Sequence, residues 1–218
     1  GKPLADILGK SMIQRVYEQC QKSTTLADVI VATDDETIYN HVIKFGGGAM
    51  MTSNSHPSGT DRCNEVIQSL DEKYDIAINI QGDEPFINPQ QIDQVTSLFN
   101  SEKVSIVTLA KKIADKALIA DRNSPKVIFD KNGIALNFCR TIAEYSTEKD
   151  YFKHIGIYGY LTKTLAEICK LSASENELKE RLEQLRWVDN NYQIKVGITT
   201  HEGVSVDTPE DIKKIKAQ

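Results

Sequence analysis

Short β-branched runs alternate with longer amphipathic stretches through the first half of the chain. Strand-like runs cover 28–32, 75–80 and 104–110, and a further group follows at 127–130, 134–139, 155–160 and 194–198. Such alternation is typical of α/β proteins in which helices cover both faces of a mostly parallel central sheet. We therefore expect this fold class, with the later strands not all joining the main sheet.

Several helix starts are marked by residues that cap helices in other proteins. The capping pairs are Thr33 with Glu36, Asn88 with Pro89, Ser174 with Glu177, and Thr208 with Pro209. The spacing of Leu178, Leu182 and Leu185 predicts the buried stripe of one helix. Between two strand-like runs, Lys131-Asn132-Gly133 predicts a tight hairpin turn, so we expect some antiparallel pairing in a small subdomain.

Composition limits the function classes. The 218 residues include 40% hydrophobic and 26% charged residues, and no repeat or linker divides them, so we expect one domain over 1–218. The formal charge of −5 argues against a protein that holds nucleic acid by neutralising phosphates. No apolar stretch approaches the ~20 residues of a membrane helix, and no signal-peptide pattern is visible, so we expect a cytoplasmic protein without membrane partners.

Acidic residues follow the strand at 75–80, in the sequence Gln81-Gly82-Asp83-Glu84-Pro85. Ligands of open α/β sheets bind beyond the carboxyl ends of the strands, and Mg2+ takes one or two carboxylates together with phosphate oxygens. Asp207 is a second candidate, because it would form a carboxylate clamp if the fold placed it beside Asp83. The alternatives are a solvated polar turn for Asp83 and a helix-dipole partner for Asp207.

Two further segments carry groups that can bind ligands. The loop over 56–62 combines Ser58, Gly59 and Arg62, which can offer backbone amides and a guanidinium to a base or phosphate; an ordinary capped turn is the alternative. In the strand at 155–160, alternation places His154, Gly156, Tyr158 and Tyr160 on one face and two isoleucines on the other. The face with hydrogen-bonding groups and small glycines has room for a ligand.

Eight segments, read in order, resemble the 3-deoxy-manno-octulosonate (Kdo) cytidylyltransferase, or CMP-Kdo synthetase, family. The segments are GKPL at 1–4, VATDD at 31–35, SGTDR at 58–62, NIQGDEP at 79–85, FCR at 138–140, KHIGIYGY at 153–160, LEQLR at 182–186 and VDTPEDI at 206–212.

The resemblance implies a Rossmann-like nucleotidyltransferase fold, with a dimerisation and sugar-binding elaboration around 125–190. It implies a Mg2+-dependent reaction of CTP with Kdo that gives CMP-Kdo and pyrophosphate for lipopolysaccharide synthesis, in a homodimer. Asp83 and Asp207 would bind Mg2+, and Lys2 would contact the phosphates. The implied nucleotide ligands are Ser58, Gly59, Arg62 and Gln81. The implied Kdo ligands are Arg140, His154, Tyr158, Glu183 and Gln184.

The chain also departs from the family pattern. A first strand and a nucleotide-binding loop normally precede GKPL, so we expect both to lie before residue 1. Leu161 stands where the family usually has Arg, and the stretch 141–151 is short, which affects the rim of the sugar pocket. Three alternatives remain open at this point: a CMP-sialate-type cytidylyltransferase, a non-catalytic CTP-binding relative and a metal-dependent glycosyltransferase.

Overall fold

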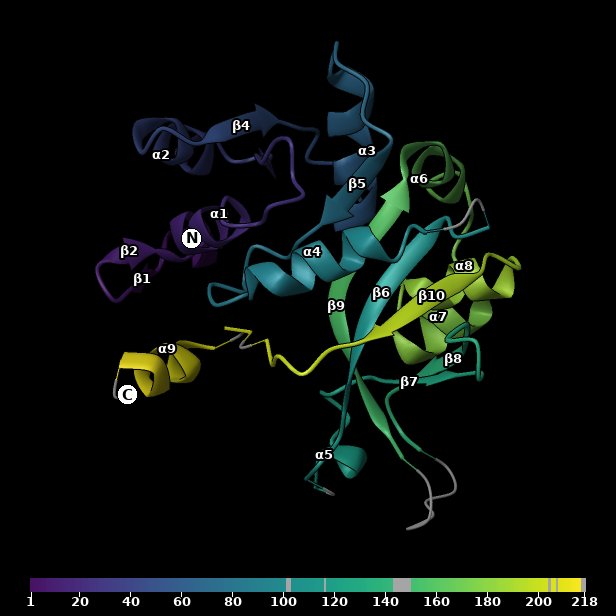
Figure 1. Ribbon diagram of the computed structural model, residues 1–218. Coiled ribbons are helices and arrows are strands. Elements are labelled where there is room, and N and C mark those ends of the chain that lie inside the picture. Colours follow the sequence, from purple (N-terminus) through teal and green to yellow (C-terminus); the bar gives the residue numbers. More distant parts are fainter. Residues whose placement is uncertain (101–102, 116, 143–149, 204, 207, 217–218) are drawn as a thin grey trace.

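The computed structural model describes residues 1–100, 103–115, 117–142, 150–203, 205–206 and 208–216. A twisted sheet forms the centre of the molecule and helices pack on both of its faces (Figure 1). The expected α/β class is therefore confirmed. Within the described part of the chain, no helix has the length and apolar character required to cross a bilayer.

The six-stranded sheet has the order β10-β6-β9-β7-β8, and β5 pairs with β9 on the edge opposite β6. Because β5, β6 and β7 all run antiparallel to β9, and β10 runs parallel to β6, four of these strands share one direction. The sheet is thus mixed, with β9 as the reversed central strand. Its strands are β5 (Ile76–Asn79), β6 (Ile106–Lys112), β7 (Lys126–Phe129), β8 (Ala135–Cys139), β9 (Phe152–Leu161) and β10 (Ile194–Ile198).

The predicted hairpin is confirmed, since β7 and β8 pair antiparallel around a turn at Gly133, whose φ is +73°. Two smaller sheets lie in the N-terminal half. A parallel pair joins β3 (Ile30–Thr33) to β4 (Gly48–Met51), and an antiparallel pair joins β1 (Asp6–Ile7) to β2 (Lys10–Ser11).

Alternate residues of β9 separate the two main hydrophobic cores, as the period-two pattern predicts. Ile155 and Ile157 pack with α1 and α4, whereas Tyr158 and Tyr160 pack with α6 and α8 on the opposite face. The helices are α1 (Met12–Cys20), α2 (Glu36–Lys44), α3 (Gly59–Ser69), α4 (Pro89–Ser97), α5 (Ala117–Ala120), α6 (Thr162–Ile168), α7 (Glu175–Glu180), α8 (Gln184–Asp189) and α9 (Pro209–Lys216), after a 3-10 turn at Lys2–Leu4.

Two local predictions were wrong. Thr33 is the last residue of β3, and Asp35 caps α2 instead, because its carboxylate accepts the amide hydrogens of Thr37 and Ile38. The leucine stripe does not lie on one helix either. Arg181 adopts a φ of +55°, which ends α7 and leaves Leu178 68% exposed, while Leu182 and Leu185 turn into the core. The N-cap at Asn88 followed by Pro89 and the capping box of Ser174 with Glu177 are confirmed.

Candidate active site

The acidic segment lies beyond the carboxyl end of β5, as its position in the sequence predicts. The Lys2 ammonium donates a hydrogen bond to Asp83 Oδ2 at 2.9 Å. About one third of the Asp83 side chain is exposed (32%), so this carboxylate remains accessible to a ligand. The 3-10 turn at Lys2–Leu4 therefore lies at the strand end where ligands of α/β sheets bind.

The segment that precedes Asp207 lies beside the Asp83 segment. Val206 donates its backbone N–H to the Asp83 carbonyl oxygen at 2.9 Å, which fixes the chain immediately before residue 207 beside the Asp83 segment. Asp207 itself lies outside the described residues, so the carboxylate clamp stays a prediction. Among the described residues, no three His, Cys, Asp or Glu side chains form a ready metal cluster. A Mg2+ ion that takes most of its ligands from phosphates and water requires fewer carboxylates than that.

The segment predicted to bind nucleotide forms the start of α3. Ser58 caps the helix: its hydroxyl accepts the amide hydrogen of Asp61 and donates to the Asp61 carboxylate at 2.6 Å. A Cβ added at Gly59 would lie 3.6 Å from the side-chain nitrogen of Asn79 and 4.0 Å from that of Gln81. The fold therefore brings Ser58, Gly59 and Gln81 together at the ends of α3 and β5.

Arg62 faces the β3–β4 side of this segment. Its guanidinium donates to Thr52 Oγ1 at 2.5 Å and forms an ion pair with Asp34 at 3.3 Å. Asp34 thus has a structural partner. The predicted nucleotide contact of Arg62 stays a prediction.

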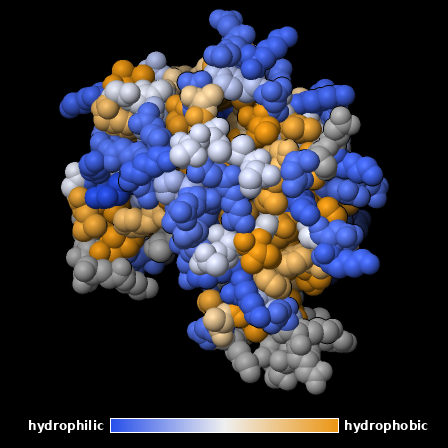
Figure 2. Space-filling view, viewed as in Figure 1, coloured by the Kyte–Doolittle hydropathy of each residue, from blue (hydrophilic) through white to orange (hydrophobic). Residues whose placement is uncertain are grey.

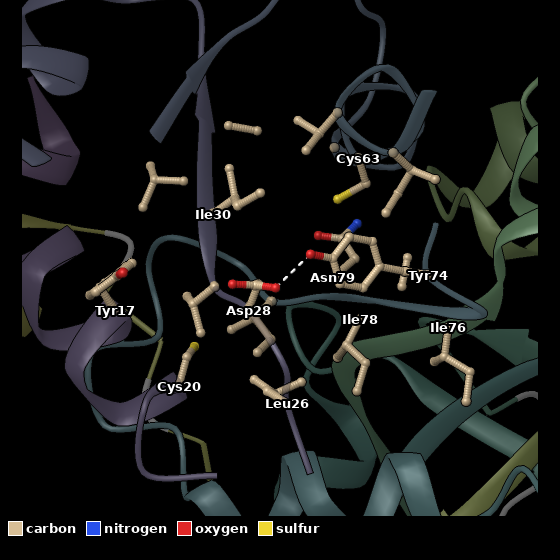
Figure 3. A pocket seen from close by; sticks show the side chains of 18 of the residues that line it. Tyr17, Cys20, Leu26, Asp28, Ile30, Cys63, Tyr74, Ile76, Ile78 and Asn79 are labelled. Atoms are coloured by element: carbon tan, nitrogen blue, oxygen red, sulfur yellow. Dashed lines mark hydrogen bonds between the residues drawn. The ribbon is translucent and has the colours of Figure 1, made fainter. Parts of the chain in front are cut away.

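A cavity of about 530 Å³ lies between β3 and β5 (Figure 3). Its walls include Ile30, Ile76, Ile78 and Cys63, and among the lining residues the Tyr74 hydroxyl donates to Asp28 at 2.5 Å. Tyr74 and Asp28 each precede a strand, so this bond ties together the starts of β3 and β5. Among the described residues, β3 pairs only with β4 and β5 only with β9, which leaves the strand edges at the cavity without a partner strand.

The predicted sugar residues of β9 lie within the core that α6 and α8 cover. The His154 and Tyr158 rings have centroids 5.3 Å apart, and His154 Nε2 lies 3.0 Å from Thr108 Oγ1. Burial lowers the pKa of His154 to about 3, so its imidazole is neutral at physiological pH. A neutral imidazole can accept or donate a hydrogen bond without adding charge.

Glu183 and Gln184 lie at the start of α8, beside these rings. The Thr60 hydroxyl donates to Glu183 Oε2 at 2.8 Å, and burial raises the pKa of the Glu183 carboxyl. Gln184 is only 5% exposed. Its amide nitrogen and the Tyr158 hydroxyl are buried without a hydrogen-bond partner among the described residues. A buried donor without an acceptor lowers the free energy of unfolding, and a polar ligand that accepts from it would remove this penalty.

Arg140 is held differently from the other predicted sugar ligands. Its guanidinium donates to three backbone carbonyl oxygens, those of Glu180, Arg122 and Arg181, at 2.8 to 3.2 Å. These bonds tie β8 to the end of α7 and to the segment before β7. A direct sugar contact of Arg140 stays a prediction.

Sequence reasoning missed the role of Thr60 and of Trp187 in assembling the site. The Trp187 ring meets the Tyr158 and Tyr160 rings edge-on, with centroids 5.1 and 5.6 Å away, and is 1% exposed. Thr60 stood inside a recognised segment, but its partner Glu183 is 123 residues away. No short-range spacing signals such a contact.

Comparison with known proteins places the chain among nucleotide-transferring enzymes. The sequence model of the family described as cytidylyltransferase matches residues 1–196. The 3-deoxy-manno-octulosonate cytidylyltransferase of Parabacteroides distasonis is 48% identical, in a match that covers all of this chain and 91% of the relative. The enzyme of the same name from Bacteroides thetaiotaomicron is 47% identical, with 97% of this chain and 89% of the relative covered.

Solved structures agree with the sequence comparison. A CMP:2-keto-3-deoxy-manno-octonic acid synthetase complexed with CTP superimposes with a TM-score of 0.93 at 38% identity, covering all of this chain and 90% of the other. A 4-diphosphocytidyl-2C-methyl-D-erythritol synthase from Anaerococcus prevotii shares the fold at a TM-score of 0.66 and 13% identity, over 99% and 91% of the two chains. The protein therefore belongs to the 3-deoxy-manno-octulosonate cytidylyltransferase family.

Proposed function

We propose that this cytidylyltransferase transfers CMP from CTP to the anomeric hydroxyl of Kdo and releases pyrophosphate. The hydrogen bond from Thr60 to Glu183 carries the proposal, because it joins the nucleotide segment to the sugar residues in one site. The similar solved synthetase that is complexed with CTP supports the nucleotide side. Orphaned donors on Gln184 and Tyr158 support a polyhydroxylated ligand on the other side.

In this mechanism the chain aligns two substrates and neutralises charge, and it forms no covalent intermediate. The Lys2 ammonium, now bound to Asp83, is placed to contact the triphosphate at the end of β5. His154, Tyr158, Glu183 and Gln184 would orient the sugar so that its anomeric oxygen faces the α-phosphorus in line with the leaving pyrophosphate. Because the pKa of His154 is about 3, we assign it hydrogen bonding and no general-base role.

Asp83 and Asp207 are the residues that would hold Mg2+. The fit rests on the exposed Asp83 carboxylate and on the bond that fixes Val206 against the Asp83 carbonyl. When bound there, the ion would lower the pKa of the sugar hydroxyl and polarise the phosphate.

A homodimer is part of this proposal, and surface hydrophobicity supports it. Hydrophobic residues interrupt the hydrophilic surface on the face drawn in Figure 2. Leu136 on β8 is 58% exposed, and Leu178 on α7 is 68% exposed. Both belong to the predicted elaboration around 125–190, where apolar side chains left in water favour an interface. We expect Leu136→Asp to shift the sedimentation of the protein from dimer to monomer, and a protein that is monomeric from the start would contradict this part.

The expected first strand is also a proposal, and the cavity between β3 and β5 supports it. Two strand edges face this cavity, and apolar side chains line it. An extended apolar segment there would pair with both edges. This chain spans 91% of the similar Parabacteroides protein, so relatives of this kind are longer. We also propose that the reaction takes place in the cytoplasm and that its product is used for lipopolysaccharide synthesis.

Pyrophosphate release tests the proposed reaction. We expect release from CTP when Mg2+ and Kdo are both present, and little release when sialic acid replaces Kdo. Release with sialic acid but not with Kdo would favour the CMP-sialate alternative. CTP binding without release in the presence of either sugar would favour a non-catalytic relative.

A further inference from the structure

Thr60 connects two parts of the molecule that are distant in sequence. It belongs to the first turn of α3, between the Ser58–Gly59 pair and Arg62, and its side chain is 3% exposed. The Thr60 hydroxyl donates to Glu183 Oε2 at 2.8 Å, immediately before the start of α8. The backbone carbonyl of Thr60 also accepts from Cys169 Sγ at 3.7 Å, which ties the same turn to the end of α6.

On the other side of this bond, Glu183 precedes Gln184, whose buried amide nitrogen has no partner among the described residues. The position of this amide depends on the start of α8, where the Glu183 carboxylate accepts from the Thr60 hydroxyl at 2.8 Å and is also hydrogen-bonded by the Ser58 side chain. The first turn of α3 is therefore linked to the residue before Gln184 by partly buried hydrogen bonds of Thr60 and Ser58. Polar contacts that are partly withdrawn from water have fewer alternative partners than solvated ones, so these bonds transmit a shift of α3 to the start of α8.

We infer that Thr60 is a positioning residue that couples the two substrates: nucleotide bound at the start of α3 pre-orients Glu183 and Gln184 for the sugar. This inference rests on the proposed function, because it assigns the two sides of the bond to CTP and Kdo. Coupling of this kind is reciprocal, so the sugar must favour nucleotide binding by the same factor. Thr60 itself touches neither substrate in this account.

Initial rates over a grid of CTP and Kdo concentrations measure the coupling directly. The interaction factor is the KM for Kdo at low CTP divided by the KM for Kdo at saturating CTP. We expect a wild-type factor of about 2 to 10, which corresponds to the net contribution of one hydrogen bond. Thr60→Val keeps the shape of the side chain but removes its hydroxyl, and we expect the interaction factor to fall toward 1.

Three further variants separate coupling from folding. Thr60→Ser keeps a hydroxyl and should show the wild-type interaction factor. If Thr60→Val folds poorly, Thr60→Ala takes its place, and we expect it to lower the factor in the same way. Thr164→Val, at another buried threonine on α6, is the matched control and should leave the factor unchanged. Thermal melting of each variant reports on folding independently.

The outcomes distinguish this inference from the reaction itself. Absence of wild-type pyrophosphate release with CTP, Mg2+ and Kdo would overturn the proposed function and the coupling with it. Normal wild-type release together with an unchanged factor in folded Thr60→Val or Thr60→Ala would overturn the coupling alone. A wild-type interaction factor of 1 would also overturn the coupling alone.

Discussion

The β9–α8 region and the β3–β5 region border the same site, and they are built in different ways. Around β9, the rings of Tyr158 and Tyr160 pack against Trp187 in a dense core with their hydroxyls buried, and the His154 ring packs against Tyr158. Around β5, the ionic groups Lys2 and Asp83 remain partly exposed, and a cavity of about 530 Å³ lies next to the strand.

This difference matches the chemistry proposed for each side. A sugar is recognised by fixed, mostly uncharged hydrogen-bonding groups, which a packed core holds in place. A triphosphate requires charges that stay available until the ligand arrives, since burying them unpaired would cost too much. The two regions should therefore respond to substitution in different ways.

The largest effect is expected at Asp83. Asp83→Asn keeps the shape and the hydrogen bond from Lys2 but removes the negative charge, so we expect kcat to fall by about 10³ with little change in the melting temperature. Steady-state pyrophosphate release measures this loss. The control is Asp71→Asn, which alters an exposed carboxylate and should leave kcat unchanged. Near-normal turnover in Asp83→Asn would reject the assignment of this residue.

A matched pair of core substitutions tests the packing contrast. Ile157 on β9 is 1% exposed, whereas Ile78 on β5 lines the cavity. We expect Ile157→Ala to lower the free energy of unfolding by about 4 kcal/mol, and Ile78→Ala by only about 2 kcal/mol because part of its surroundings is already empty. Urea denaturation measures both values. Equal losses would mean that the cavity is filled in the protein in solution.

Gln184 should separate function from stability. Gln184→Leu has a similar volume and removes a buried donor that has no partner among the described residues. We therefore expect the free energy of unfolding to stay the same or to rise by about 1 kcal/mol. We also expect the KM for Kdo to rise about tenfold while the KM for CTP stays constant. Steady-state kinetics and urea denaturation give the two readouts. Equal increases in both KM values would remove Gln184 from the sugar side.

The last prediction concerns the pH dependence of stability. In the folded protein the pKa of His154 is about 3, below its ordinary value of 6.5, so between these values the unfolded chain binds a proton that the folded one does not. The stability that neutral His154 contributes is therefore complete above pH ~6.5 and falls by up to about 1.4 kcal/mol per pH unit as the pH decreases toward 3.

Unfolding free energies measured from pH 4 to 8 for wild type and His154→Gln isolate this contribution, because other titrating groups cancel in the difference. The raised pKa of Glu183 acts in the opposite direction, with stability lost as the pH rises through the folded value, and it is common to both proteins. A constant difference across the range would contradict a buried neutral His154.

Much of the fold could be predicted because single strands carry their own signals. Residues 194–198 form β10 with the expected bounds, and the turn at Gly133 joins β7 to β8 as its residue types require. The leucine prediction failed because periodicity cannot detect that Arg181 takes a positive φ and divides the helix. Strand pairing was also beyond the pattern, since nothing in the β9 sequence indicates that it runs opposite to β5 and β6.

For the site, the placement of a side chain could be predicted where it follows from position along a strand. Asp83 lies beyond the end of β5, and His154 and Tyr158 share one face of β9, as alternation requires. Prediction was incomplete where the contacts of a side chain depend on a residue distant in sequence. Arg140 bonds to three carbonyl oxygens, and Thr60 bonds to Glu183. These contacts join segments that are distant in sequence, and no local pattern indicates which of them pack together.

The most direct test of the account follows one oxygen atom. Kdo that carries 18O at its anomeric hydroxyl is incubated with the protein, CTP and Mg2+, and both products are analysed by mass spectrometry. Attack of this hydroxyl on the α-phosphorus predicts that the label is retained in a CMP-sugar and absent from pyrophosphate. Label in pyrophosphate, or turnover of CTP without a labelled CMP-sugar, would contradict the account.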